Sequence, residues 1–143
     1  MLSPLQIRRH WLGEVQLKPA DNPIEEALRL RSISCRGVLA ARFREDDTRR
    51  WLLKLSVELL PGEESAPSLY TGFIEMLGDF QVHADYPEEK RADLVKVGGG
   101  GILYSCIREW VSLVTARSVH GPVELPTLDP RSFLGDGEEG GKK

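Results

Sequence analysis

The stretch WLLKLSVEL, residues 51–59, alternates apolar residues with residues of other kinds. Its odd-numbered positions are all apolar, whereas Lys54, Ser56 and Glu58 hold most of the even-numbered ones. Successive side chains of a β-strand point to opposite faces of the sheet, so a period of two predicts a strand with one buried face. The rest of the sequence must then supply the neighbours of this strand and the cover for its buried face.

The same alternation in three further segments predicts a four-stranded sheet, and these segments are residues 35–44, 5–17 and 69–83. The polar stretch 45–48, which precedes the strand at 51–59, is typical of a hairpin turn. In the segment 5–17, Arg9 interrupts the apolar face and Leu12 interrupts the polar face.

The apolar period changes from that of a strand to that of a helix after residue 101. One face of the stretch from Gly101 to Ser118 collects Leu103, Ile107, Trp110, Val111 and Val114. We expect Gly98–Gly101 to form the loop before this helix, because glycine weakens a helix interior. This loop is not predicted to bind phosphate, since Ile102 and Leu103 stand where a phosphate loop has Lys and Ser or Thr.

The remaining segments connect or follow these elements. The crossover from Pro19 to Ile33 fits either a short helix, capped at Asn22-Pro23 and carrying Ile24, Ala27 and Leu28, or a loop. Prolines in Val123–Phe133 predict an extended segment. The chain of 143 residues fits one domain, which we place at residues 1–134, and the charged, glycine-rich stretch 135–143 predicts a disordered tail.

Strands followed by one helix predict an α+β fold, in which one long helix packs on one face of a four-stranded antiparallel sheet. One helix covers one face, so part of the other face stays exposed in a monomer. We expect some of the following apolar residues to stay exposed: Leu12, Val38, Leu52, Phe73 and Leu77. Exposed apolar patches indicate association or ligand surfaces. The strand at residues 5–17 also predicts an open edge that invites pairing with another copy.

The composition argues against nucleic-acid and membrane partners. The net charge is -3, whereas nucleic-acid binders need a basic excess to neutralise phosphates. No apolar run approaches the length of about 20 residues that crosses a bilayer, and residues 1–15 lack the apolar core of a signal peptide. Cys35 and Cys106 lie far apart and predict reduced thiols, so we expect a cytoplasmic protein.

No constellation of residues predicts catalysis, a metal or another cofactor. His10, His83 and His120 share no metal-ligand spacing. His83 and Asp85 fall on one face of a strand, but Ser105 lacks the GxSxG context of a nucleophile elbow. We therefore expect a protein that binds a partner and is not an enzyme.

Several stretches resemble the SecB family of export chaperones. They include residues 70–75, 78–82 and 102–109, the last ending in an Arg-Glu pair. The resemblance continues through Thr115, Gly121-Pro122, Leu125-Pro126 and Phe133, and the first strand resembles that of the family in its aromatic Trp11. It implies an ATP-independent holdase for protein export, a tetramer built as a dimer of dimers, that binds unfolded client polypeptides without a cofactor.

The resemblance also implies positions for two kinds of contact. Clients would lie in a groove formed by the crossover and the helix, where the apolar residues are Ile24, Leu28, Leu30 and Trp110. The translocase ATPase SecA docks on acidic residues of the exposed sheet face. Glu14 matches one of these acids, but Lys18, Thr71 and Phe73 occupy the other places, and the second C-terminal helix of the family is absent or vestigial.

Because of these departures, the resemblance supports client binding more strongly than it supports docking to SecA. The sequence therefore leaves an alternative function open. In this alternative, a SecB-like chaperone serves one dedicated partner, such as the antitoxin of a toxin–antitoxin–chaperone system.

Overall fold

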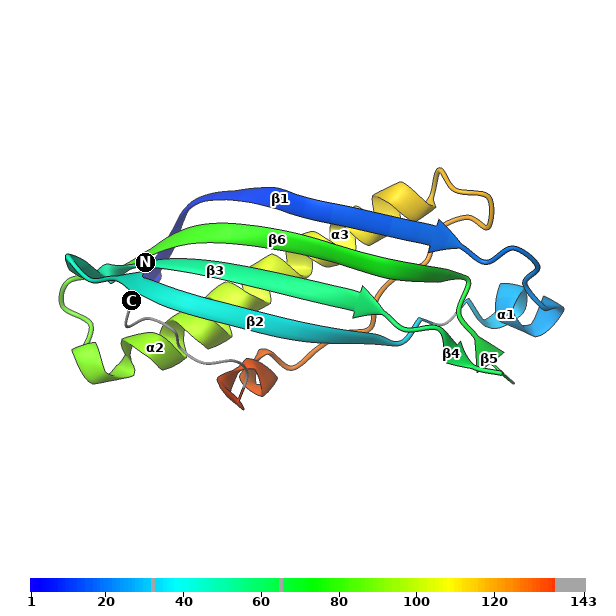
Figure 1. Ribbon diagram of the computed structural model, residues 1–143. Helices are drawn as coiled ribbons and strands as arrows, with labels where there is room; N and C mark the ends of the chain where they lie inside the picture. Colours follow the sequence, from blue (N-terminus) through cyan, green and yellow to red (C-terminus); the bar gives the residue numbers. More distant parts are fainter. Residues whose placement is uncertain (32, 65, 136–143) are drawn as a thin grey trace.

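A computed structural model describes residues 1–31, 33–64 and 66–135 and contains the expected sheet and helix (Figure 1). The four long strands are β1 (Leu5–Pro19), β2 (Cys35–Arg44), β3 (Asp47–Leu59) and β6 (Tyr70–Val82). They pair antiparallel in the order β1-β6-β3-β2, which makes β1 and β2 the edges. Two short strands, β4 (Gly62–Glu63) and β5 (Ala66–Pro67), form a separate ribbon. The α+β fold class predicted from the sequence is confirmed.

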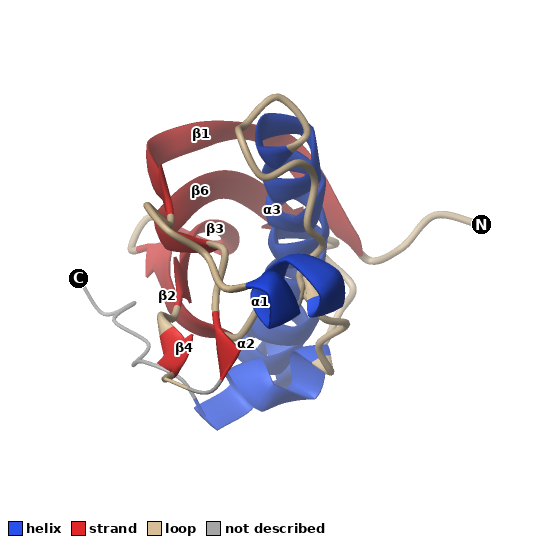
Figure 2. Ribbon diagram, turned by 90° about the vertical axis from the view of Figure 1, so that its right-hand side faces the viewer, coloured by secondary structure: helices blue, strands red, loops and turns tan. Residues whose placement is uncertain are grey.

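A helical segment of 28 residues crosses one face of the sheet (Figure 2). It comprises η1 (Glu88–Lys90), α2 (Arg91–Leu94), the π-helical turn η2 (Val95–Gly99) and α3 (Gly100–Thr115). The core lies between α3 and the sheet, where Leu103, Ile107 and Val111 of α3 are fully buried. Large apolar side chains of every second sheet position complete the core, among them Leu53, Leu55, Met76 and Phe80. The sheet therefore has a helix-covered face and an open face.

Two β-bulges in β1 explain the breaks in its alternation. The pairing of β1 with β6 shifts by one residue between Ile7 and Arg9 and again between Leu12 and Glu14. A one-residue shift moves the following side chains to the other face of the sheet. Leu12 therefore packs against the core, opposite Met76, and is not one of the apolar residues that stay exposed on the uncovered face.

The same shifts place Trp11 on the open face, opposite Leu77. The guanidinium of Arg9 lies over the Trp11 ring, 4.9 Å from its centroid. Of the other apolar residues expected on the open face, Val38 is exposed and Leu52, Phe73 and Leu77 are half-buried. One helix thus leaves the open face as a surface of mixed apolar and charged residues.

The expectation that Gly98–Gly101 form a loop was wrong, because these residues lie inside the helical segment. Packing explains the glycines. A Cβ on Gly99 would stand 2.7 Å from Cδ2 of Leu53, and one on Gly100 would stand 2.6 Å from Cδ2 of Phe133. The missing side chains let the helix approach the sheet and the C-terminal segment closely, which offsets the low helix propensity of glycine.

The crossover forms a short helix, α1 (Glu25–Leu30), so the helical one of the two alternatives is correct. Its N-cap is Ile24 and not Asn22, and it ends at Arg31 in the left-handed conformation. After α3, residues 120–129 have no regular structure, and Pro130–Gly135 form a 3-10 helix, η3. The predicted tail, residues 135–143, lies outside the described residues apart from Gly135.

Three hydrogen bonds tie the segment after α3 back onto that helix. The Tyr104 hydroxyl donates to the Pro126 carbonyl at 2.6 Å, and Nε of Arg108 donates to the Leu125 carbonyl at 3.1 Å. The backbone N–H of Val123 donates to Oγ1 of the fully buried Thr115 at 3.0 Å. Burial raises the pKa of Tyr104, so its hydroxyl keeps the proton that it donates.

We expect Thr115→Val to lower the free energy of unfolding by about 1–3 kcal/mol, because the valine leaves the buried Val123 N–H without a partner. Thr115→Ser keeps the hydroxyl and is the matched control. Urea unfolding, followed by tryptophan fluorescence, measures both variants. Equal stability of the valine and serine variants would show that the hydroxyl does not hold this segment.

Candidate functional site

The short helix α1 lies at one end of the molecule (Figure 1) and carries exposed apolar side chains at three positions. Ile24, Leu28 and Leu30 are 44%, 39% and 50% exposed. The side chain that α1 buries is that of Ala27, so the larger apolar residues lie away from the core. Exposed apolar side chains do not stabilise the folded monomer, because contact of apolar area with water is unfavourable. We call these three residues the crossover surface.

Polar contacts fix the crossover surface to the turn that follows α3. Arg31 donates from Nε to the Pro122 carbonyl at 3.1 Å, and from Nη2 to the carbonyls of His120 and Pro122. Nε2 of His120 lies 2.7 Å from the Ala20 carbonyl, at the start of the crossover. The exposed Val119 belongs to this turn and adds a further apolar side chain at the same end of the molecule. These contacts hold α1 in a defined place, although little of it is buried.

A second apolar surface runs along α3. Ile102, Trp110 and Leu113 are exposed and the thiol of Cys106 is half-buried between them. The spacing of four, four and three residues places them on one flank of the helix. The segment 122–129 lies on another flank, where Arg108 and Tyr104 bind it. We call the four residues the helix stripe. Burial, with a smaller contribution from Glu109, raises the pKa of Cys106 and keeps its thiol protonated.

The structure therefore groups three of the four predicted client-binding residues and sets the fourth apart. Ile24, Leu28 and Leu30 form the crossover surface, whereas Trp110 belongs to the helix stripe. Leu113 and Val119, which are 57% and 76% exposed, were not among the residues predicted from the sequence. Leu113 is detectable from its helical spacing to Trp110. Nothing in the sequence around Val119 shows that it lies at the α1 end of the molecule.

The predicted docking position Glu14 lies on the open face, because the bulge at Gly13 turns it there. Glu14 pairs with Glu75, Gln16 with Phe73, and Lys18 with Thr71. The four positions that the SecB resemblance implies for docking thus gather on neighbouring strands β1 and β6. Their composition is one acid, one base, one hydroxyl and one aromatic side chain, so they do not form an acidic patch.

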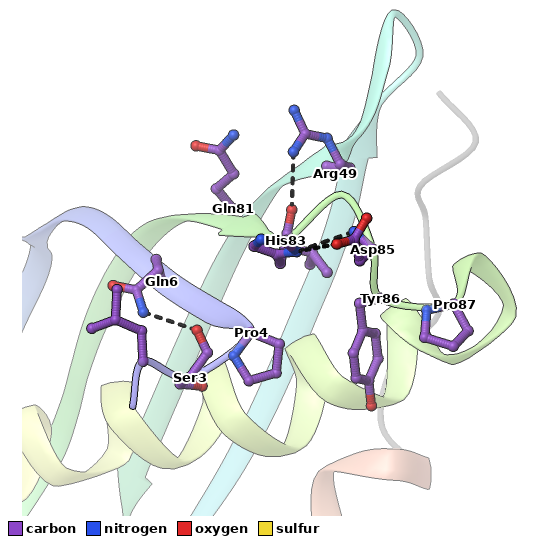
Figure 3. A pocket seen from close by; sticks show the side chains of 11 residues that line it. Ser3, Pro4, Gln6, Arg49, Gln81, His83, Asp85, Tyr86 and Pro87 are labelled. Atoms are coloured by element: carbon purple, nitrogen blue, oxygen red, sulfur yellow. Dashed lines mark hydrogen bonds and ion pairs between the residues drawn. The ribbon is translucent and has the colours of Figure 1, made fainter.

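A cavity of about 580 Å³ lies at the other end of β1 and β6 (Figure 3). Its lining includes Pro4, Arg49, His83 and Tyr86. Nδ1 of His83 accepts a hydrogen bond from the backbone N–H of Asp85 at 3.1 Å, and the Asp85 carboxylate lies 3.9 Å from the same atom. The Ser3 hydroxyl accepts a bond from the Leu5 N–H. Among the lining residues, the His83 ring is therefore partnered by Asp85.

Metal ligands do not converge in the described part of the chain. Within residues 1–31, 33–64 and 66–135, no three side chains of His, Cys, Asp or Glu gather to hold a metal ion. Over the same residues, no helix is both long and apolar enough to cross a membrane.

The four-stranded antiparallel sheet with a long helix on one face matches the fold of a SecB-like chaperone. Among solved structures, this chain matches the SecB-like chaperone Rv1957 of Mycobacterium tuberculosis, in complex with a ChAD peptide from the Rv1956 HigA1 antitoxin. The TM-score is 0.65 and the identity 21%, over 87% of this chain and 91% of that chain. The fold that the sequence resemblance implied is confirmed.

A protein of unknown function from Streptococcus agalactiae also matches, with a TM-score of 0.48 and 13% identity, over 86% of this chain and 97% of that chain. No family model matches the sequence. A search of curated proteins gave no match either.

Proposed function

We propose that this protein is a SecB-like chaperone of the cytoplasm, which binds unfolded polypeptide segments on its crossover surface without ATP or chemistry. The observation that carries the proposal is the exposure of three large apolar side chains, Ile24, Leu28 and Leu30, at one short helix that polar contacts hold in place. The fold supports it, because a protein of the same fold is a chaperone that holds a peptide.

The energetics of such a surface suit reversible holding. Burying one large apolar side chain fully is worth about 1.5–3 kcal/mol, and these side chains are about half covered already. Each therefore contributes about 1 kcal/mol to a bound client. Several weak apolar contacts bind many sequences with modest affinity, and a bound client is withdrawn from folding by mass action.

Self-association is part of the proposal, since the SecB resemblance implies a dimer of dimers. The open edge of β1 supports it, because an edge strand offers unpaired backbone groups to a second copy. The helix stripe supports it too, since Trp110 and Leu113 expose apolar area that an identical helix covers well. In this arrangement Trp110 contributes to assembly more than to client binding.

A chaperone dedicated to one partner is the second candidate. The M. tuberculosis neighbour holds a peptide from an antitoxin. In addition, the positions implied for SecA docking hold Lys18, Thr71 and Phe73 beside Glu14, which is a poor match to an acid-dependent export partner. Both observations favour a single partner over general export.

The affinity of the chaperone for different clients separates the two candidates. We expect several unrelated, reduced and unfolded proteins to bind within about tenfold of one another in the absence of nucleotide, because apolar contacts discriminate weakly. Isothermal titration calorimetry measures these affinities, and the same proteins in their folded form are the control. A peptide that binds a hundredfold more tightly than all of them would support the dedicated partner. Absence of binding to all of these unfolded proteins would contradict the first candidate, a chaperone for many clients.

A further inference from the structure

Arginines gather on the open face at the hairpin end of the sheet, far from the crossover surface. Arg42 and Arg44 of β2 and Arg50 of β3 line a hollow of about 280 Å³, together with Leu52 and Asp79. Arg9 of β1 approaches the same Asp79 from the far side, at 4.0 Å. The acids that contact these four arginines are Asp79 and Asp46, and Asp47, which pairs with Arg49, adds a further negative charge at the turn.

The two acids that contact the four arginines leave much of their positive charge unneutralised. Asp46 binds Arg44 through both carboxylate oxygens, at 3.1 and 2.9 Å. Asp79 accepts from Nη2 of Arg50 at 3.2 Å and is shared with Arg9. Within the described residues, the exposed Arg42 has no ion pair, and Nε of Arg50 is buried without a hydrogen-bond partner.

From this arrangement we infer that the hollow is a docking site for an acidic segment of a partner polypeptide. Guanidinium groups form paired, directional hydrogen bonds with carboxylates, which a partner's Asp or Glu side chains supply. Leu52 offers apolar contact in the same hollow, and the edge strand β2 offers free backbone groups to an extended segment. The inferred partner segment is thus acidic. A partner that recognises an acidic sheet face would instead be basic.

Charge and geometry favour a polypeptide over a nucleic acid. The whole chain carries a net charge of -3, and the arginine cluster is local, so a long phosphate backbone would meet repulsion beyond it. Asp46 and Asp79 lie within the cluster itself. Single carboxylates on a flexible segment can reach Arg42 and Arg50 between these acids. Docking here does not depend on client binding at α1, because the two surfaces lie at opposite ends of the sheet (Figure 1).

The test uses a fluorescein-labelled peptide of alternating Glu and Ser, with the Gln–Ser peptide as neutral control and a single-stranded oligonucleotide of equal charge as competitor. Fluorescence anisotropy at low salt measures binding to the full chain. We expect the acidic peptide to bind, and Arg42→Glu to weaken it at least tenfold. Arg117→Glu makes the same charge change at an exposed site at the other end of α3, and we expect less than a twofold effect.

Three outcomes would overturn the inference. They are no binding of the acidic peptide by the unchanged protein, an equal loss in the Arg42→Glu and Arg117→Glu variants, and tighter binding of the oligonucleotide than of the peptide. Binding of an unfolded client is measured on the same variants. Because it is expected to survive Arg42→Glu, failure of this inference is distinguishable from failure of the proposed chaperone function.

Discussion

Replacing Ile24, Leu28 and Leu30 together by aspartate is expected to weaken the binding of an unfolded, reduced client at least a hundredfold. Each substitution removes about 1 kcal/mol of apolar contact and places a charge where the client would exclude water. The combined loss of at least about 2.7 kcal/mol corresponds to a hundredfold change in the dissociation constant. Isothermal titration calorimetry against the clients used for the unchanged protein measures the effect.

The fold should survive this triple substitution, since all three side chains are exposed and the core residue of α1 is Ala27. Circular dichroism and the melting temperature check this. A control with two substitutions, Leu2→Asp and Leu134→Asp, puts negative charge on exposed apolar residues away from α1 and should leave client affinity unchanged. Unaltered client binding by a folded triple variant would remove the crossover surface from the proposed function.

Trp110→Asp separates assembly from client binding. If the helix stripe joins two copies, this variant lowers the mass measured by light scattering while each protomer keeps its crossover surface. A loss of client binding without a change in mass would place Trp110 in the client site, as expected from the sequence.

Local patterns in the sequence were enough to predict the strands. Alternation over residues 51–59 reflects direct contact of every second side chain with the core, and this contact is repeated in β6 and in part of β2. The bulges in β1 were not predictable as such, because a bulge depends on which residues of β6 stand opposite. Their trace was visible only as the misplaced Arg9 and Leu12.

The glycines at 98–101 are a case in which the local sequence predicts the wrong structure. Helix propensity is a local quantity, and it predicts a loop there. The deciding contacts, with Leu53 of β3 and Phe133 near the C-terminus, are distant in sequence. The missing side chains of Gly99 and Gly100 allow an approach that a larger residue forbids, and this gain appears only in the packed structure.

For the candidate sites too, the sequence shows the residue types, whereas only the structure shows how these residues are arranged. The apolar character of Ile24, Leu28 and Leu30 is visible in the sequence, but their exposure appears only in the structure, where Arg31 joins α1 to the turn after α3. The arginine cluster was not predicted, because Arg42, Arg50 and Asp79 meet only through the register of β2, β3 and β6. A sequence with a net charge of -3 gives no hint of a local basic hollow.

Gly72→Ala is expected to destabilise the fold more than the loss of the Thr115 hydroxyl does. Gly72 has φ of +128°, a conformation that residues with a side chain rarely adopt. A Cβ at this position would lie 1.8 Å from the backbone oxygen of Gln16 in β1. The clash is with backbone, so it is relieved only if β1 separates from β6 near its end.

We expect this variant to lose at least about 3 kcal/mol of stability, because strained backbone and broken strand pairing add. For a domain of this size, the melting temperature should fall by roughly 10 °C. Gly101→Ala is the control, since its Cβ would meet Cβ of Pro130 at 3.4 Å, within ordinary contact, and alanine favours a helix. Differential scanning calorimetry compares the two, and a melting temperature of Gly72→Ala close to that of the unchanged protein would contradict the expectation.

The position of Gly72 connects this stability effect to function. Gly72 pairs with Leu17 of β1 and with Leu59 of β3, so the strain falls where the edge strand joins the sheet. The crossover that carries α1 begins directly after Pro19, the last residue of β1. Displacing the end of β1 therefore moves the crossover surface as well. At temperatures where Gly72→Ala remains folded, we expect client affinity to fall although no residue of that surface has changed.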